Sequence, residues 1–497
     1  MHQVLTVSPT ITRSPSRWDA LSTLRVPIWM AVAFILLTTH ADPDLFGHLK
    51  FGLDHLRTGH VSSADPYSFT SDLPWINHEW LSELTMAVAY SLGGIPGLVV
   101  LKGLVFLAAF AMLSALLRDV APLWRWPSCL LAVVGIFPLS ITVRPQMWTL
   151  LFLVLTCAIL RGPWQRRAWL PLIFAVWANM HGGWLVGFGV VAIWSALEVF
   201  ESADSTLPLW ASIGVPVACL LATLINPYGW HLWEFLAKTV RLTRDDIAEW
   251  QPLWRAPGAA VAHWTATVIW AGLAIRYSEK KSIKAIAATA ILAYSSLRLV
   301  RMVALFTPAA VILLIPRSPL SATSRPAQTA ARAKTVMDLA FAGIGLLLIA
   351  SPIKPGCVQM VGDRWVPDPT VARAISTADL SGRMITSFNW GEYAIWHFGP
   401  KVRVSMDGRR ETVYSEAVVA EQHKILVGEP ASMMRLQADL PEYAWLPKGY
   451  GEGAQRWFAS HGYRIDLNTP LSFLAVRSDL RRVPRVAAGP APCFPGV

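Results

Sequence analysis

The chain has 497 residues, of which 54% are hydrophobic and only 15% are charged, and its mean hydropathy is +0.42. A soluble globular protein of this length carries more charge, so these values argue against the soluble classes and predict several membrane crossings. The net charge of +11 comes from basic residues clustered in short gaps between apolar runs. That pattern favours a role in orienting the chain in a membrane, and we expect no nucleic-acid partner.

The N-terminal segment 1–25 is polar, contains three arginines and precedes an apolar run without a small-residue cleavage motif. We therefore expect a cytoplasmic tail followed by an uncleaved first span. From 26 to 352 the sequence predicts a polytopic α-helical membrane domain. Its eleven candidate spans are 26–40, 95–117, 128–143, 147–160, 168–180, 183–199, 209–225, 258–275, 284–297, 302–316 and 337–352. Several are shorter than the roughly 20 residues that cross a bilayer, so their ends are approximate.

The distribution of Lys and Arg predicts the orientation of these spans. With the N-terminus inside, the inner connections carry more basic residues than the outer ones, as expected for a plasma (inner) membrane protein. This threading requires "EWLSELTMAVAYSLGG" (79–94) to lie along the outer face as an amphipathic helix. The first outer loop is then 41–94.

The region 353–497 has a different composition, with more Gly, Pro and charge and with alternating runs such as "KVRVSMDG" and "LSFLAVRS". Such alternation predicts strands, and we expect a small α/β domain. An odd number of spans makes it extracytoplasmic. Cys357 and Cys493 flank this domain, and an oxidising compartment would allow them to form a disulfide. Two free thiols are the alternative.

Under this threading, polar residues from the ends of distant spans gather on the outer side. Ionisable groups in such places are candidates for function. They are Asp42, Asp44, His48, Glu79, Arg144, His181, Arg298 and Arg301, with Lys102 inside the second span.

The acidic residues after the first span have two interpretations. Asp44 fits the N-cap of a helix over "LFGHLKFGLDHLR", with Pro43 holding Asp42 extended. Two carboxylates at a membrane exit, with His48 one turn later, favour a functional role. Asp407 and Gly408 are predicted to form a turn after a strand, or else a wall of the site.

The basic candidates also have structural alternatives. Arg144 either anchors a span in the headgroup layer or takes part in catalysis, and His181 is a turn residue or a ligand-binding residue. Arg298 and Arg301 bind lipid headgroups in general or one particular phosphate. Lys102 either extends outward to the interface or meets an anionic ligand.

The stretch "DPDLFGHLKFGLDHLRTGHVSSADPYSFTSDLPWINHEWLSEL", followed by many spans, resembles the first outer loop of the integral-membrane GT-C glycosyltransferases. The stretches "VRPQMW", "ANMHGGW", "NPYG", "EWQPL" and "FNWGEYAIWHFGPKVRVSMDGRRETVY" resemble bacterial multi-span members of that superfamily. The resemblance covers most of the chain. It implies hexosyl or pentosyl transfer from a polyprenyl-phosphate donor to a glycan, lipid or protein acceptor. An acid of the first outer loop then acts as base or metal ligand, and Asp44 or Asp42 matches that position.

The chain also departs from that pattern. Asp-Pro-Asp and "NHEWL" replace the adjacent Asp-Glu and the Pro-Pro of the mannosyl- and aminoarabinosyl-transferases, which leaves donor sugar and acceptor open. A carboxylate of Asp44, Asp42 or Glu79 takes the acceptor's proton. Arginines and Lys102 stabilise the leaving phosphate, while His48 and His181 complete the substrate-binding set.

The sequence leaves open whether a metal is used and whether the protein is an enzyme. We assign no metal; if a divalent cation is used, its plausible ligands are Asp42, Asp44, His48 and Glu79. A transporter or flippase of a lipid-linked or anionic solute is one rival function, and a non-catalytic envelope assembly protein is another. The sequence has no duplicated half and its charges gather on one side, which favours an enzyme.

Overall fold

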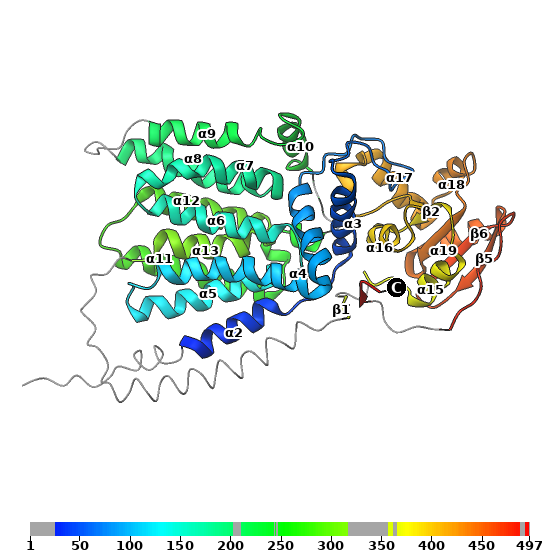
Figure 1. Ribbon diagram of the computed structural model, residues 1–497, viewed down its shortest axis with the longest axis horizontal. Helices are drawn as coiled ribbons and strands as arrows, with labels where there is room; N and C mark the ends of the chain where they lie inside the picture. Colours follow the sequence, from blue (N-terminus) through cyan, green and yellow to red (C-terminus); the bar gives the residue numbers. More distant parts are fainter. Residues whose placement is uncertain are drawn as a thin grey trace, which may run out of the picture.

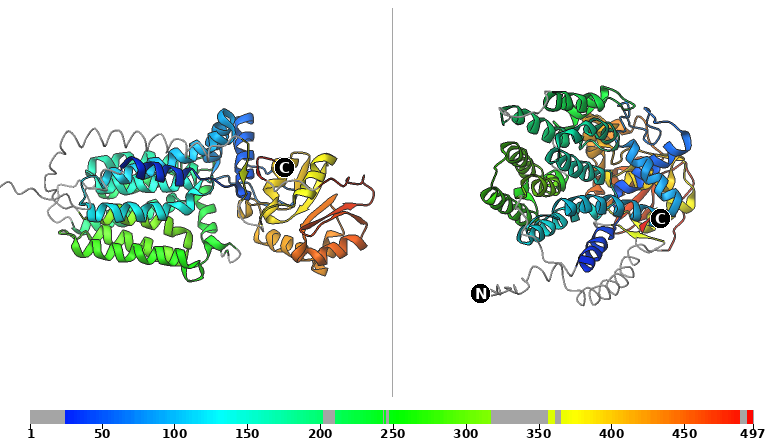
Figure 2. Two further views of the ribbon diagram at one scale, coloured as in Figure 1. Left: turned by 90° about the horizontal axis from the view of Figure 1, so that it is seen from below. Right: turned by 60° about the vertical axis from the view of Figure 1, so that its left-hand side comes forward.

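The computed structural model describes residues 25–201, 210–242, 244, 247–316, 356–360, 365–487 and 493–496. A helical bundle forms one end of the molecule and a domain with a central sheet forms the other (Figures 1 and 2). The predicted fold class, a polytopic helical part with a small C-terminal α/β domain, is confirmed. The eleventh expected span, 337–352, lies outside the described residues, as do residues 1–24.

The bundle helices coincide with the other ten expected spans. They are α2 (Arg25–Leu37), the second half of α4 (Trp80–Leu116), α5 (Pro122–Ser140), α6 (Gln146–Arg161), α7 (Leu170–Met180), α8 (Trp184–Glu201), η2 and α9 (Trp210–Gly214 and Val215–Ala222), α11 (Gly258–Tyr277), α12 (Ile283–Arg298) and α13 (Val303–Leu314). Of these, α4, α5 and α11 are long and apolar enough to cross a membrane. The short connecting elements are η1 (Trp164–Trp169), α10 (His231–Thr239), η3 (Ala248–Trp250), η4 (Leu253–Arg255) and η5 (Val300–Met302).

Apolar side chains of the bundle face outward as well as inward. All residues of α13 are buried, whereas Leu104, Leu130, Leu172 and Ile225 are each more than half exposed on the bundle surface. In water, each exposed side chain of this size would forgo about 1.5–3 kcal/mol of burial energy. A bundle that is apolar on both its inside and its outside is suited to lipid.

Two helices lie crosswise to the bundle, between it and the C-terminal domain. They are α3 (Pro43–Thr58) and the first half of α4 (Figure 1). α4 is broken at Gly94, whose φ of 58° and ψ of −141° are not helical. The segment 79–94 therefore does not continue straight into the helix that runs through the bundle. This is the orientation expected of a helix along a membrane face.

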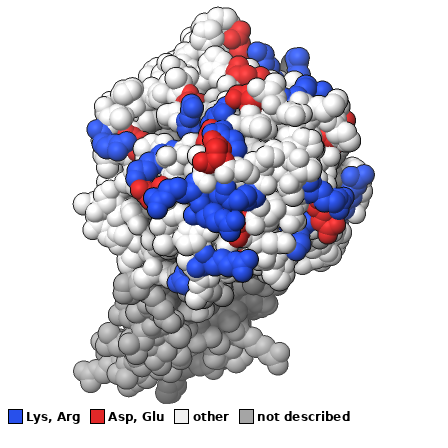
Figure 3. Space-filling view, turned by 90° about the vertical axis from the view of Figure 1, so that its right-hand side faces the viewer, with Lys and Arg blue, Asp and Glu red and all other residues white. Residues whose placement is uncertain are grey.

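The C-terminal domain contains a mixed five-stranded sheet in the order β3-β2-β4-β6-β5. β2 pairs in parallel with β3 and β4, and β6 pairs antiparallel with β4 and β5. The strands are β2 (Gly382–Thr386), β3 (Val402–Val404), β4 (Tyr443–Pro447), β5 (Tyr463–Asn468) and β6 (Ser472–Arg477). The helices and turns are α15 (Pro369–Ala378), α16 (Phe388–Phe398), η6 (Arg410–Thr412), α17 (Glu416–Val427), α18 (Pro430–Leu436) and α19 (Lys448–Ser460). The end of the molecule that this domain forms carries many charged side chains (Figure 3), as a surface in water does.

The first loop is docked on the C-terminal domain at the edge of β3. The amide of Val404 donates to Tyr67 O at 3.0 Å and the amide of Phe69 donates to Val404 O at 3.1 Å. Further along, Asp72 and Leu73 donate to Val413 O. The loop thus adds an edge segment to the sheet, so loop and domain form one unit.

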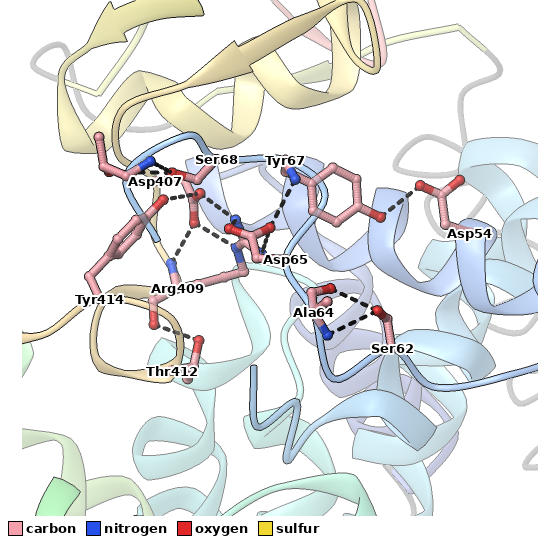
Figure 4. A network of polar contacts seen from close by, with 11 residues as sticks. Asp54, Ser62, Ala64, Asp65, Tyr67, Ser68, Asp407, Arg409, Thr412 and Tyr414 are labelled. Atoms are coloured by element: carbon pink, nitrogen blue, oxygen red, sulfur yellow. Dashed lines mark hydrogen bonds and ion pairs between the residues drawn. The ribbon is translucent and has the colours of Figure 1, made fainter. Parts of the chain in front are cut away.

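A buried ion-pair network fixes this docking (Figure 4). Arg409 binds Asp65 with two hydrogen bonds of 2.7 and 3.0 Å and also binds Asp407 at 2.7 and 2.8 Å. Tyr414 donates to Asp407 at 2.7 Å. Burial by itself would raise the pKa of Asp407, but the charge and hydrogen bonds of Arg409 and the hydrogen bond from Tyr414 lower it. The predicted Asp407 turn is therefore the centre of a contact between loop and domain.

Candidate active site

Asp42 and Asp44 take different roles at the start of α3. Asp42, not Asp44, is the N-cap: its side chain accepts from the amide of Leu45 at 3.1 Å. The N-cap interpretation of Asp44 is therefore wrong. The physical reason is Pro43, which is favoured at the first helical position, so that the cap falls on the residue before it. The side chain of Asp42 is 2% exposed and that of Asp44 is 35% exposed, which leaves Asp44 as the accessible carboxylate.

Arg144 from the turn between α5 and α6 holds both carboxylates. Its Nε donates to Asp42 Oδ2, and its Nη2 lies 2.7 Å from Asp44 Oδ2. The pKa of Arg144 is raised by Asp42, Asp44 and Glu249 against the effect of burial. Arg144 therefore remains cationic between the two carboxyl groups at the start of α3.

Short segments that run parallel to each other set the positions of Asp42 and Arg144. The amide of His40 donates to Ile141 O at 2.8 Å, and that of Ala41 donates to Gln359 O at 2.8 Å. Gln359 belongs to β1 (Val358–Gln359), which pairs with β7 (Cys493–Phe494). A disulfide joins Cys357 and Cys493, as the first of the two interpretations of these cysteines expected. The tail of the C-terminal domain thus braces the segment that carries Asp42.

Lys102 supports the segments that carry Asp42 and Arg144. It is fully buried, and its Nζ donates to Thr38 O at 2.7 Å and to Ser140 O. These carbonyls lie at the ends of the segments leading to Asp42 and Arg144. Its Nζ thus contacts backbone carbonyls and is buried, which does not fit outward extension, while contact with an anionic ligand stays a prediction.

A third acid links Arg144 to a second arginine. Glu249 Oε1 lies 3.7 Å from Arg144 Nη1 and 3.7 Å from Arg301 Nη1. The guanidinium of Arg301 also lies over the ring of Trp250, 4.7 Å from its centroid, and that of Arg244 lies over the same ring at 3.9 Å. Arg144 and Arg301, 157 positions apart in the chain, thus converge on one oxygen atom.

Arg298 lies at the end of α12, exposed to solvent. Within the described part of the chain no hydrogen bond or ion pair of its side chain is recorded. The structure brings Arg301 to Glu249 but leaves Arg298 outside this group.

A second polar cluster adjoins the first. His48 Nδ1 lies 3.1 Å from Glu83 Oε1 and 3.9 Å from Glu79 Oε2, and Asn77 donates to Glu83 Oε2 at 2.6 Å. Burial lowers the pKa of His48, but the hydrogen bond to Glu83 and the charges of Glu79, Glu83 and Asp44 raise it to about 9. His48 is therefore a cation at neutral pH.

His181 faces the same cluster in a defined tautomer. Its Nδ1 accepts from the amide of Gly183 at 2.9 Å and lies 2.7 Å from the hydroxyl of Thr149. The neutral ring therefore carries its proton on Nε2, which lies 3.5 Å from Glu79 Oε1. His78 Nε2 lies 3.7 Å from the same oxygen, so His78 and His181 both approach Glu79.

We expect the stability of the fold to depend on the charge of His48. Because its pKa is raised in the folded state, its contribution is complete below the unfolded value of about 6.5 and is lost as pH rises towards 9. The loss amounts to at most about 3 kcal/mol. In detergent, the melting temperature of the wild type should fall from pH 7 to 9 by more than that of His48→Gln. His231→Gln, which changes an exposed histidine, serves as the control; equal falls in all three proteins would contradict this.

The four suggested metal ligands do not form one site. Asp42 and Asp44 face Arg144, whereas His48 and Glu79 face Glu83 and the other histidines. No group of three His, Cys, Asp or Glu side chains suited to a metal ion occurs among the described residues. We derive no step that passes through a metal.

Three acids of this region were not among the candidate site residues named from the sequence. Glu83 follows Glu79 by one helical turn, a spacing that places both on one face. Glu249 belongs to "EWQPLW", and Glu392 is an isolated carboxylate in the apolar helix "FNWGEYAIWHF". An acid in an otherwise apolar helix is a usable signal, but only the fold places Glu249 near Arg144, Glu392 near Asp44 and Glu83 beside His48.

The sequence matches no family model and no curated protein. The Archaeoglobus fulgidus oligosaccharyltransferase is similar in structure, with a TM-score of 0.53 at 9% identity over 87% of this chain and 70% of that chain. ArnT from Cupriavidus metallidurans, bound to undecaprenyl phosphate, matches with a TM-score of 0.50 at 13% identity over 93% of this chain and 98% of its own. The chain has the GT-C fold. The mycobacterial arabinofuranosyltransferase AftD gives 0.47 at 14% identity over 94% of this chain and 40% of its own.

The GT-C fold covers the helical bundle and the C-terminal domain together, since the match to ArnT takes in nearly the whole of both chains. The resemblance inferred from the sequence motifs is thereby confirmed at the level of the fold. At these identities the similarity concerns the fold alone, and the chemistry must be argued from the residues of this chain.

Proposed function

We propose that the protein is a GT-C glycosyltransferase that moves a sugar from a polyprenyl-phosphate donor to an acceptor at the outer face of the plasma membrane. One observation carries the proposal: Arg144 and Arg301 converge on a single anionic oxygen next to the accessible carboxylate of Asp44. This arrangement provides a place for an anion and a proton acceptor side by side.

The anion is the phosphate of the lipid. Glu249 now lies between the two arginines, but at 3.7 Å from each and with a side chain 41% exposed it is loosely held. Arginine forks match phosphate oxygens better than a single carboxylate oxygen. A phosphate that displaces Glu249 would contact both guanidiniums. The structural neighbour ArnT is bound to undecaprenyl phosphate, which supports a polyprenyl lipid.

Asp44 is the base. An acceptor hydroxyl gives its proton to the Asp44 carboxylate, and its oxygen forms a bond to the anomeric carbon of the sugar. The bond from that carbon to the phosphate oxygen breaks, and the electron pair leaves with the polyprenyl phosphate. Arg144 and Arg301 stabilise the negative charge that develops there. One such displacement inverts the configuration at the anomeric carbon.

The remaining groups bind the substrates and position the base. Asp42, buried and capped onto α3, orients Arg144 and is not accessible to an acceptor. Glu79 with His48, His78 and His181 forms a polar wall that we assign to the hydroxyls of the sugar or the acceptor. Arg298, exposed near Arg301, is suited to the lipid headgroup layer. In this proposal the C-terminal domain lies outside the cytoplasm together with this site.

Mass spectrometry of lipid-linked sugars and envelope glycans tests the proposal. Cells without the protein should accumulate one polyprenyl-phosphate sugar and lack one sugar on a glycan, lipid or protein. The wild-type gene should end the accumulation and return the missing sugar. A flippase would instead change the side on which the lipid-linked sugar accumulates. A scaffold would leave the sugar composition unchanged, and either result would refute glycosyl transfer by this chain.

A further inference from the structure

Glu392 of α16 reaches from the C-terminal domain to the start of α3. The residue is 4% exposed, and two glycines make room for it. A Cβ atom on Gly47 would lie 2.3 Å from Glu392 Oε2, and one on Gly408 would lie 2.6 Å from Glu392 Oε1. Any side chain at these two positions would therefore collide with the carboxyl group of Glu392.

The carboxyl group of Glu392 also lies near Asp44. The Cβ position on Gly408 that lies 2.6 Å from Glu392 Oε1 lies 3.2 Å from Asp44 Oδ1. Both carboxyl groups thus border one point, and their oxygens are close enough for a bond through one water molecule.

The cations near Glu392 already have other partners. Arg409 binds Asp65 and Asp407, and Arg144 binds Asp42 and Asp44. Glu392 Oε2 has no hydrogen-bond partner among the described residues. The charged groups that act on it are Asp42 and Asp44 of the α3 start and Asp407 and Arg409 of the turn after β3.

A buried carboxyl group in such surroundings is more stable with its proton. An ionised carboxylate without a partner is costly to bury, and two carboxylates that face each other resist ionising together. Burial, followed by the charges of Asp44 and Asp407, raises the pKa of Glu392 well above its ordinary value. Arg144 Nη2 lies 2.7 Å from Asp44 Oδ2, whereas Glu392 Oε2 has no hydrogen-bond partner among the described residues.

We propose that Glu392 is a positioning residue that stays protonated and donates a hydrogen bond, through one water molecule, to Asp44 Oδ1. This bond fixes the plane of the Asp44 carboxylate and leaves lone pairs free on both oxygens for the proton of the acceptor. The C-terminal domain thereby completes the site formed by the bundle and α3. The inference rests on the proposed function for its effect on turnover, but not for the state of Glu392.

The state of Glu392 is tested without any substrate. Infrared spectra of the full chain in lipid nanodiscs at pH 7.5 should contain a protonated-carboxyl band that Glu392→Gln loses and that Glu452→Gln, an exposed control on α19, retains. A raised pKa makes the wild type lose stability as pH rises above the unfolded value of about 4.3. The melting temperature of Glu392→Gln should therefore exceed that of the wild type by a margin that grows from pH 5 to pH 8. An unchanged band or a constant margin would overturn the proposal.

The effect on turnover separates positioning from base catalysis. Gln keeps a hydrogen-bond donor, so we expect Glu392→Gln to retain kcat within about threefold, whereas Glu392→Leu should lose roughly tenfold or more with little change in KM. An equal and large loss in both variants would show that the ionised form of Glu392 is needed, and would refute the proposal. If no transfer by the wild type is found, the infrared and stability results still decide the state of Glu392. A failure of the proposed function can therefore be told apart from a failure of the Glu392 proposal.

Discussion

Replacing Asp44 with Asn is expected to reduce glycosyl transfer by a factor of about 10² to 10⁴, the range typical for loss of a general base. The amide has the shape of the carboxylate but cannot take the proton of the acceptor. The phosphate contacts of Arg144 and Arg301 remain, so binding of the polyprenyl-phosphate donor should change little. The measurement is single-turnover transfer with purified protein in nanodiscs, alongside donor binding.

Asp379→Asn is the matched control for this experiment, because Asp379 pairs with Lys401 on the exposed surface of the C-terminal domain. It should retain full turnover. The assignment of Asp44 as base would be wrong if Asp44→Asn kept wild-type turnover. A loss of donor binding equal to the loss of turnover would show instead that Asp44 serves the binding of the donor.

Replacing Arg409 with Met is expected to destabilise the contact between the first loop and the C-terminal domain by about 3–5 kcal/mol. The cation is the shared partner of Asp65 and Asp407, whose side chains are almost completely buried. Without it, two carboxylates remain in a poorly solvated place (Figure 4). The melting temperature should drop, and proteases should cut within 60–78 sooner than in the wild type.

Arg435→Met provides the comparison, since Arg435 forms an exposed ion pair with Glu421, and it should not measurably change either result. Adding Asp65→Asn and Asp407→Asn to Arg409→Met should recover part of the lost stability, because the uncompensated charges are then removed. If Arg409→Met melted and resisted proteolysis like the wild type, the docking role of this network would be refuted.

Hydropathy predicted the bundle because apolar runs must become helices wherever lipid surrounds them. The ten spans within the described residues therefore match helices to within a few residues, apart from the start of α5. The alternating runs of the C-terminal region predicted β3 and β6, because the alternation of apolar and polar residues along a strand is also a local pattern. The order of the strands in the sheet does not follow from these local patterns, since β2 lies between strands that come later in the chain.

The site was predicted in part. Arg144 contacts Asp44 and shares Glu249 with Arg301, whereas the catalytic and binding roles of these residues stay predictions. The cap formed by Asp42 and the carbonyl contacts of Lys102 were not predicted, since both depend on which backbone groups lie opposite them. Glu249 and Glu392 come from distant segments, and no local spacing connects them to Asp44.

In the proposed reaction, Arg144 and Arg301 hold the phosphate of a polyprenyl lipid beside Asp44. The most direct measurement is a structure of the full chain in nanodiscs with polyprenyl phosphate added. We expect phosphate oxygens within hydrogen-bonding distance of both guanidiniums, with Glu249 displaced and Asp44 facing the open side. A phosphate bound elsewhere on the bundle, with Glu249 still between the two arginines, would contradict it.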